Sequence, residues 1–236
     1  MNILVTGANG QLGTEMRNAA RPLSDHYVFT DVSSLPGVET VYLDITNRDA
    51  VRLICDSEKI DLIVNCAAYT NVDKAEEDLQ MADLLNHQAP GILAAVAAER
   101  GAHLIHISTD YVFDGTAHLP YQEDTTPSPD SVYGSTKLAG ELAVSKFCHR
   151  SLIIRTAWLY SPFGNNFVKT MIRLGKERTE LGVVFDQIGS PTYAYDLACT
   201  ILQIVESGIQ PGVFHYSNEG VISWYDFSKA IHHLAG

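Results

Sequence analysis

The hydrophobic positions of this chain fall into short runs that are separated by longer amphipathic stretches. Runs rich in β-branched residues are typical of strands buried on both faces, and apolar residues at helical spacing fill most of the segments between them. We expect strands within NILVTG, YVFTD, TVYLD, DLIVNCAA, HLIHIS and LIIRTAWLY, and helices within QLGTEMRNAARPL, NRDAVRLICDSE and DLQMADLLNHQAPGILAAVAAERG. This alternation predicts an α/β fold, a Rossmann-like doubly wound parallel sheet with helices on both faces.

The pattern becomes less regular after about residue 160. Helices are expected within NNFVKTMIRLGKER and YAYDLACTILQIVESG, and short strands within GVVFDQ and GVFHYSN. We therefore predict a large α/β domain over residues 1–160 and a smaller C-terminal lobe over 161–236, partly interwoven with it. The chain ends in a helical stretch, SWYDFSKAIHHLAG, where Ser223 would be the N-cap and Asp226 would lie in the first turn. Nothing follows to cover its apolar face, so we expect the lobe to be truncated.

Composition narrows the classes of partner. The chain has 236 residues, 46% of them hydrophobic, which is enough for one large core and a smaller lobe. A formal net charge of −12 argues against a nucleic acid or an anionic membrane as partner. The four cysteines are far apart and are expected to be reduced thiols, and the chain opens on a strand-like run without a basic leader. We therefore expect a cytoplasmic protein. His103 and His106 should point to opposite faces of a strand, so no metal site is predicted.

The first candidate site is the glycine-rich segment VTGANGQLG, which follows a strand and opens a helix. In this context Gly7 would permit a tight turn, Gly10 a close approach to a pyrophosphate, and Gly13 close packing of helix and strand. The free N–H groups of the helix N-terminus would bind the phosphates. Asp31 ends the next strand, where a carboxylate can accept hydrogen bonds from a ribose and would repel a 2′-phosphate. Asp31 therefore favours NAD over NADP. Together with the glycine-rich segment it predicts that the domain of residues 1–160 binds a dinucleotide.

Further residues follow the carboxyl ends of the next two predicted strands. Asp44 and Ile45 are placed to contact an adenine, and the small Ala67 and Ala68 would let a cofactor lie against the backbone. Ligands bind at this edge of open α/β sheets.

The second candidate site combines Thr109, at the end of a strand, with Tyr133 and Lys137, four residues apart on a predicted helix. Residues at this spacing share a helix face. An ammonium beside a phenol would lower the pKa of Tyr133, which could then transfer a proton, while Lys137 could also hold the cofactor ribose. The Thr109 hydroxyl would polarise a substrate carbonyl. With a nicotinamide, these groups would reduce a ketone.

Several longer motifs carry a family resemblance: ILVTGANGQLG, NCAAYTNVDKAE, LLNHQAPGILA, HISTDYVFDG, YGSTKLAGE, RTAWLY, NNFVKTM and DQIGSPTYAYDLA. Through them the chain resembles the extended short-chain dehydrogenase/reductases, and more narrowly the dTDP-4-dehydrorhamnose reductases of dTDP-rhamnose biosynthesis, from residue 3 to beyond residue 197. The resemblance implies reduction of the C4 ketone of dTDP-4-dehydro-L-rhamnose with NADH or NADPH, with a nucleotide-sugar substrate and a possible homodimer. It also implies Tyr133 as the acid, Lys137 as its partner and Thr109 as the carbonyl polariser.

The same resemblance extends the list of site residues. It implies a substrate pocket lined by Thr109, Asp110, Tyr111 and Trp158, and a cofactor site contacted by Gly10, Gln11, Leu12, Asp31, Asp44, Ile45, Ala67, Ala68 and Tyr69. Family members usually continue beyond the point where this chain ends.

Alternatives remain for the function and for two features. A sugar-nucleotide 4-epimerase uses the same Tyr and Lys pair but regenerates its cofactor, and a relative of this fold serves as the regulatory subunit of methionine adenosyltransferase without known turnover. Trp158 would either stack on a ligand or pack in the core. Lys169, Arg173 and Lys176 form a positive helix face, which would either meet a diphosphate or simply be solvated.

Overall fold

A computed structural model describes all residues, 1–236. Its centre is a sheet of seven strands in the order β10-β6-β5-β4-β1-β2-β3, and every neighbouring pair is parallel. The strands are β1 (Asn2–Thr6), β2 (His26–Asp31), β3 (Val41–Tyr42), β4 (Leu62–Asn65), β5 (His103–Thr109), β6 (Ser151–Thr156) and β10 (Gly212–Tyr216). The predicted Rossmann-like doubly wound fold is confirmed.

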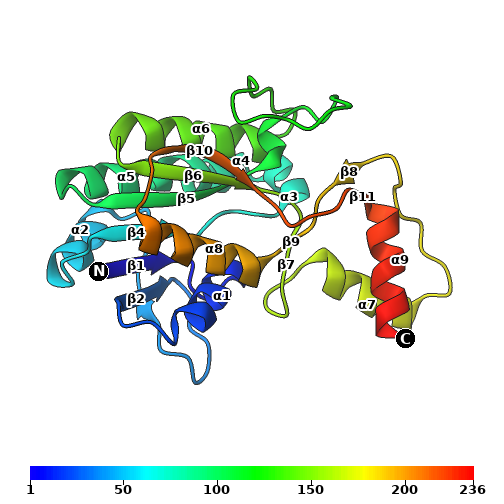
Figure 1. Ribbon diagram of the computed structural model, residues 1–236, viewed down its shortest axis with the longest axis horizontal. Coiled ribbons are helices and arrows are strands. Elements are labelled where there is room, and N and C mark those ends of the chain that lie inside the picture. The colour runs from blue at the N-terminus through cyan, green and yellow to red at the C-terminus, as the bar shows by residue number, and fades with distance from the viewer.

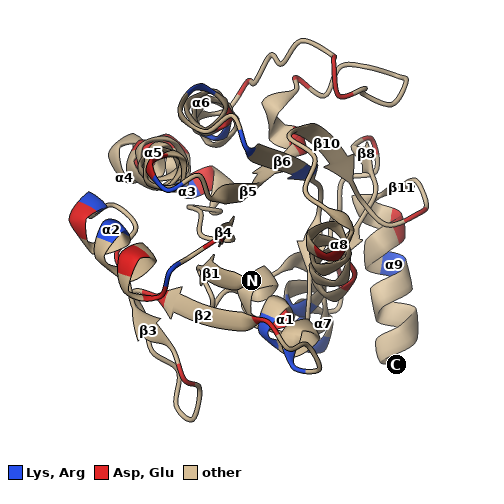
Figure 2. Cartoon of the chain, turned by 60° about the vertical axis from the view of Figure 1, so that its left-hand side comes forward, with Lys and Arg blue, Asp and Glu red and all other residues tan.

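Helices cover both faces of the sheet, as Figure 2 shows. One face carries α2 (Arg48–Ser57), α5 (Ala89–Glu99) and α6 (Val132–Phe147), and the other carries α1 (Gln11–Ala20) and α8 (Ala194–Ser207). Each face has its own apolar core: Leu4, Ile63, Leu104 and Ile153 pack under α2 and α5, whereas Val5, Val64, Ile105 and Ile154 pack under α1 and α8. Burial on both faces explains why the strands are continuous apolar runs.

A small lobe lies beyond the carboxyl ends of the strands (Figure 1). It contains α7 (Phe167–Glu177), α9 (Trp224–Ala235) and the short pairs β7 (Leu159–Tyr160) with β9 (Thr192–Tyr193) and β8 (Ile188–Gly189) with β11 (Ile222–Ser223). The predicted cap of the last helix is confirmed, because Ser223 and Asp226 exchange hydrogen bonds in a capping box.

Three local expectations are corrected. TVYLD gives only the exposed two-residue edge strand β3, because no further strand covers it. GVVFDQ forms no strand, and β8 begins only at Ile188. The long helix predicted from residue 78 is interrupted: α4 (Leu79–Asp83) and α5 are joined by a π-helical turn, Leu84–Gln88, which turns Asn86 into the interior.

Two segments from beyond residue 160 return to the main sheet. β10 pairs with β6, and Leu197, Ala198 and Ile201 of α8 belong to the core under α1. The division at residue 160 stays a prediction. In the C-terminal part of the chain, residues 157–193 and 217–236 lie outside the sheet layers. No helix combines the length and apolar character that crossing a bilayer requires.

Candidate active site

The glycine turn between β1 and α1 has the shape that a pyrophosphate requires. Gly7 has a φ of +64°, and a Cβ there would lie 2.6 Å from the backbone nitrogen of Ala67. A Cβ on Gly13 would lie 2.3 Å from the carbonyl oxygen of Gly7. Gly10 precedes α1 without any side-chain cap, so the first N–H groups of the helix have no side-chain partner there. These features fit a dinucleotide whose phosphates bind the helix N-terminus.

The other residues predicted to contact the cofactor lie near the glycine turn, but the side chains of two of them are buried. Asp31 ends β2 beside the turn and accepts hydrogen bonds from the backbone N–H groups of Asn9 (3.1 Å) and Ser33 (2.9 Å). Asp44 accepts from Thr46. Leu12 and Ile45, by contrast, are buried in the two cores, so only their backbone is available to a cofactor. The cofactor contacts themselves stay predictions.

Helix α6 carries Tyr133 and Lys137 against the end of β5. The side chain of Ser131 caps the helix. A Cβ on Gly134 would lie 2.1 Å from the carbonyl oxygen of Tyr111, and a Cβ on Gly140 would lie 2.0 Å from that of Asn86. The two glycines therefore let α6 approach the turn after β5 and the π-turn before α5, and this approach buries both Tyr133 and Lys137.

The Thr109 side chain is hydrogen-bonded within its own turn and lies beside Tyr133. The Thr109 hydroxyl donates to the Asp110 carboxylate over 3.0 Å and accepts from the backbone N–H of Tyr111. Thr109 beside the phenol lowers the pKa of Tyr133, but burial is the larger effect and raises that pKa well above the value of a free tyrosine. Burial also raises the pKa of Asp110, to about 6.

The Lys137 ammonium points to the backbone. Its Nζ donates to the carbonyl oxygen of Ile107 over 2.7 Å, and burial lowers the pKa of Lys137 to about 8 although Glu141 opposes the shift. The expectation that Lys137 lowers the pKa of Tyr133 is therefore not met in this structure, because desolvation of the phenol dominates. A tyrosine that stays protonated at neutral pH still suits a proton donor. A role of Lys137 in holding the cofactor ribose stays a prediction.

Two polar groups near the site were missed from the sequence. Asn86 is fully buried, and its side chain bonds the backbone N–H (2.8 Å) and carbonyl (3.0 Å) of Tyr69 and the hydroxyl of Thr136 (3.3 Å). It ties the end of β4 to α6. An Asn shortly before a Pro within an apolar helical stretch, LLNHQAP, is the available signal.

The second missed group is a buried ion pair. Arg155 of β6 binds Glu141 of α6 with Nη2–Oε2 at 2.7 Å and Nε–Oε1 at 2.9 Å, and Ser108 of β5 donates to the same carboxylate. Both charged side chains are at most 6% exposed. The pair fixes α6 to the sheet one helical turn beyond Lys137.

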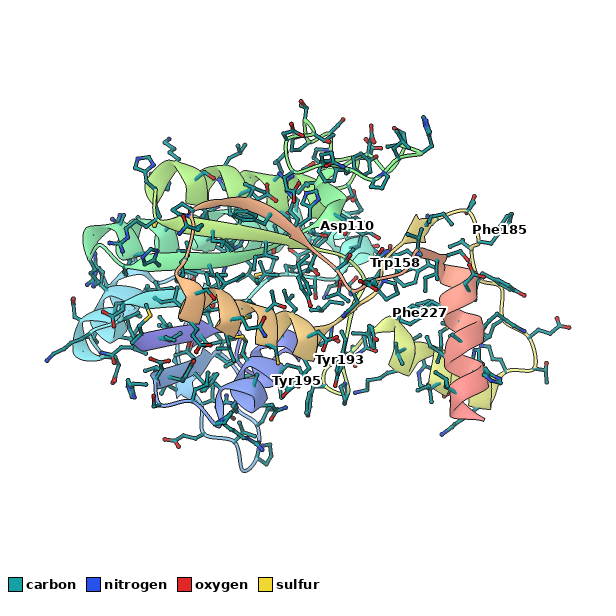
Figure 3. The ribbon with its side chains drawn as sticks, viewed as in Figure 1. Asp110, Trp158, Phe185, Tyr193, Tyr195 and Phe227 are labelled. Atoms are coloured by element: carbon teal, nitrogen blue, oxygen red, sulfur yellow. The ribbon has the colours of Figure 1, made fainter.

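Trp158 lies at the junction of the sheet domain and the lobe, as does Asp110 (Figure 3). Its φ is +48°, and its ring stacks on Trp224 with centroids 3.6 Å apart. A Cβ on Gly189 would lie 2.7 Å from the same indole. The indole thus packs in the aromatic core of the lobe, and a lining role in the substrate pocket stays a prediction. Tyr69 packs near Tyr133, and its hydroxyl has no partner.

The glycine turn and the lobe are also connected directly. Asn166, the cap of α7, donates to the side-chain oxygen of Gln11 over 2.9 Å. On the basic face of α7, Lys169 donates to the carbonyls of Pro162 and Gly164, and Arg173 pairs with Glu177. Two of the three basic side chains on that face therefore have partners within their own segment.

The glycine turn after β1 suits a pyrophosphate, and the hydroxyl side chains of Thr109 and Tyr133 lie near the end of β5. Together they define the class of protein, a Rossmann-fold oxidoreductase that depends on a dinucleotide. The model of the RmlD substrate binding domain family matches residues 1–236, and the chain belongs to this family.

Known relatives match over nearly the whole chain. A dTDP-4-dehydrorhamnose reductase from Aggregatibacter actinomycetemcomitans is 44% identical over 234 residues, 97% of this chain and 77% of the relative. The crystal structure of a dTDP-4-dehydrorhamnose reductase from Clostridium acetobutylicum is 46% identical and has a TM-score of 0.93, covering 100% of this chain and 81% of that one. The crystal structure of a dTDP-4-dehydrorhamnose reductase from Bacillus anthracis, in complex with NADP, is 41% identical and has a TM-score of 0.91. It covers 99% of this chain and 80% of that one.

Proposed function

We propose that the chain is an NADH- or NADPH-dependent reductase that converts the C4 ketone of dTDP-4-dehydro-L-rhamnose to the alcohol of dTDP-L-rhamnose. The observation that carries the proposal is the approach of α6 to the end of β5. This approach brings Tyr133 to Thr109 at the sheet edge that also holds the glycine turn. The names of the relatives supply the substrate.

The residues divide the work of a carbonyl reduction. The bound nicotinamide supplies the hydride. The Tyr133 hydroxyl gives its proton to the oxygen of the ketone as negative charge develops there, and its raised pKa keeps it protonated beforehand. The Thr109 hydroxyl orients and polarises the carbonyl, and Lys137 holds the cofactor ribose. Burial of all three side chains excludes water, which strengthens each of these interactions.

The proposed cofactor site contains the glycine turn with Gln11, Asp31 at the end of β2 and Asp44 after β3. It also contains Ala67, Ala68 and Tyr69, which follow β4. Asp110, Tyr111 and Trp158 are proposed to face the substrate. A homodimer, a cytoplasmic location and the absence of a nucleic-acid partner stay predictions.

The test follows cofactor absorbance with dTDP-4-dehydro-L-rhamnose as substrate. The parent chain should consume one NADH or NADPH for each ketone reduced, and Tyr133→Phe should lose at least about a thousandfold in kcat, within the range that general acid catalysis supplies. Tyr27→Phe is the matched control, because it removes a tyrosine hydroxyl near the start of β2, at the opposite end of the strand from the site. Interconversion of nucleotide sugars without cofactor consumption would instead indicate an epimerase, and unchanged turnover in Tyr133→Phe would refute the proposed acid.

A further inference from the structure

One hydrogen bond joins the glycine turn to the small lobe. The side-chain amide of Asn166, which precedes α7, donates over 2.9 Å to Oε1 of Gln11, the first residue of α1. No other hydrogen bond connects residues 7–13 with residues 157–193. The two residues are 155 positions apart in the sequence, so the bond exists only because the lobe packs against the turn.

Two further hydrogen bonds fix the orientation of Asn166. Its Oδ1 accepts from the backbone N–H of Lys169 over 3.0 Å, which caps α7, and its Nδ2 also donates to the carbonyl oxygen of Ser161 over 2.8 Å. Because the oxygen of this amide is engaged at the cap, its nitrogen faces Gln11, and Gln11 presents its oxygen. The donor and the acceptor of the contact therefore have fixed roles.

The loop before α7 also packs on Gln11. Gly164 has a φ of +61°, and a Cβ there would lie 2.9 Å from Cγ of Gln11. Lys169 donates to the carbonyl oxygens of Pro162 and Gly164, so the same loop is attached to the first turn of α7. The position of residues 161–166 therefore depends on where the Gln11 side chain lies.

Each end of this contact adjoins a proposed ligand site. Gln11 begins α1, whose first N–H groups are proposed to bind the pyrophosphate, so a bound dinucleotide would hold this residue in place. The loop of residues 161–166 follows closely on Trp158, which is proposed to face the substrate. A ligand at either site therefore favours the arrangement in which Asn166 is bonded to Gln11.

Resting on the proposed function, we propose that Asn166 couples the cofactor site to the substrate site, so that the dinucleotide and the nucleotide sugar each bind more tightly when the other is bound. Asn166 is a positioning residue, because it acts through Gln11 and not on a reacting atom. Coupling of this kind is reciprocal: the factor by which the first ligand raises the affinity for the second equals the factor in the opposite direction.

The competing explanation is that Asn166 only caps α7. Serine is about as good an N-cap as asparagine, but its side chain is too short to reach Gln11. Asn166→Ser therefore keeps the cap and removes the bond between the lobe and the turn. Asn47→Ser is the matched control, because Asn47 caps α2 by accepting from the N–H of Ala50 over 3.1 Å, on the opposite face of the sheet from α1.

The test measures the coupling with two ligands that do not react with each other. The dissociation constant of dTDP is measured by calorimetry with and without saturating NADPH, and that of NADPH with and without saturating dTDP. In the parent each ligand should lower the dissociation constant of the other by about tenfold, within the usual range of such couplings. In Asn166→Ser both factors should fall below about threefold, whereas Asn47→Ser should keep the parent factors.

A second variant approaches the same contact from the loop. Gly164→Ala should also lower both factors, because its Cβ would displace the Gln11 side chain while Asn166 keeps its cap. This variant decides the test if thermal unfolding shows that Asn166→Ser is not folded.

Independent binding of the two ligands in the parent, or an unchanged factor in Asn166→Ser, would overturn the coupling. Weaker binding of both ligands with an unchanged factor would also overturn it, because that result indicates a structural role alone. If the parent binds no dTDP, the proposed function fails and the coupling fails with it. If the parent reduces the ketone but binds the two ligands independently, only the coupling fails.

Discussion

Replacement of Lys137 by Met should make the stability of the protein respond differently to pH. Lys137 is 2% exposed, and its ammonium has a single hydrogen-bond partner, the carbonyl oxygen of Ile107. An ammonium in such surroundings is poorly solvated, so burial lowers its pKa from 10.5 to about 8. The folded protein therefore releases this proton at a lower pH than the unfolded chain does.

The sign and size of the effect follow from that difference. Between pH 8 and pH 10.5 the unfolded chain binds the proton and the folded protein does not, so the Lys137 contribution to stability rises with pH. A fall in pKa from 10.5 to about 8 corresponds to a cost of about 3 kcal/mol for the charged form. Most of this cost is present at pH 7 and most is gone at pH 10. Relative to the parent, Lys137→Met should therefore lose about 2–3 kcal/mol of stability between these two pH values.

The assay is urea unfolding of both proteins at several pH values from 7 to 10. Loss of the hydrogen bond to Ile107 changes the free energy of unfolding of the variant by about 1–3 kcal/mol at every pH. The diagnostic quantity is therefore how the stability difference between variant and parent changes with pH, and not its value at one pH. The buried thiols and Tyr133 titrate in both proteins and cancel. Lys146→Met, which replaces an exposed lysine of the same helix, should give a difference that is constant with pH. A constant difference for Lys137→Met as well would refute the inference that the buried ammonium is destabilised.

Three further outcomes are expected. Arg155→Leu should lose about 3–5 kcal/mol of stability in denaturant unfolding because it strands Glu141, and the double replacement by Leu should lose less than the single one. Gly140→Ala should lower the melting temperature by more than 5 °C, which is about 2 kcal/mol for a chain of this size, because its Cβ would meet the backbone oxygen of Asn86. Gly182→Ala, whose Cβ would meet nothing within 4 Å, should leave the melting temperature unchanged. Asp31→Ser should shift the ratio of kcat/KM values towards NADPH by about tenfold, since it removes the carboxylate that repels a 2′-phosphate; an unchanged ratio would place the ribose elsewhere.

The parts of the fold that the sequence predicts well are those determined by burial on both faces of one element. The strand runs ending at Thr6, Asn65 and Thr109 are apolar because helices cover both sides of the sheet, so their pattern is visible without knowledge of the partners. The glycine turn is equally local, because Gly7 requires a positive φ and the helix follows at once. The edge strand β3 is exposed and only two residues long, so the apolar pattern of TVYLD predicted a longer strand than the structure contains.

The features that were missed depend on contacts between distant segments. Nothing local shows that Arg155 and Glu141 are a buried pair, because charged residues in a sequence usually indicate solvent exposure. The stacking partner of Trp158 is Trp224, in the last helix, so a choice between ligand and core could not be made from RTAWLY alone. Tyr133 was expected to have a lowered pKa from its spacing to Lys137, whereas the balance of burial and charge that raises it exists only in the folded protein.

The position of α6 matters more for the chemistry than the spacing of its two functional residues. A tyrosine and a lysine four residues apart share a face on any helix, and that face is useful only if it meets Thr109 in the interior. Here Gly134 and Gly140 allow backbone contact on two sides, and the Glu141–Arg155 pair attaches the same helix to β6. Substitutions at these three points should therefore move Tyr133 without touching it. We expect them to reduce kcat by displacing the proton donor, while cofactor affinity, which depends on the glycine turn at the end of β1, should change less.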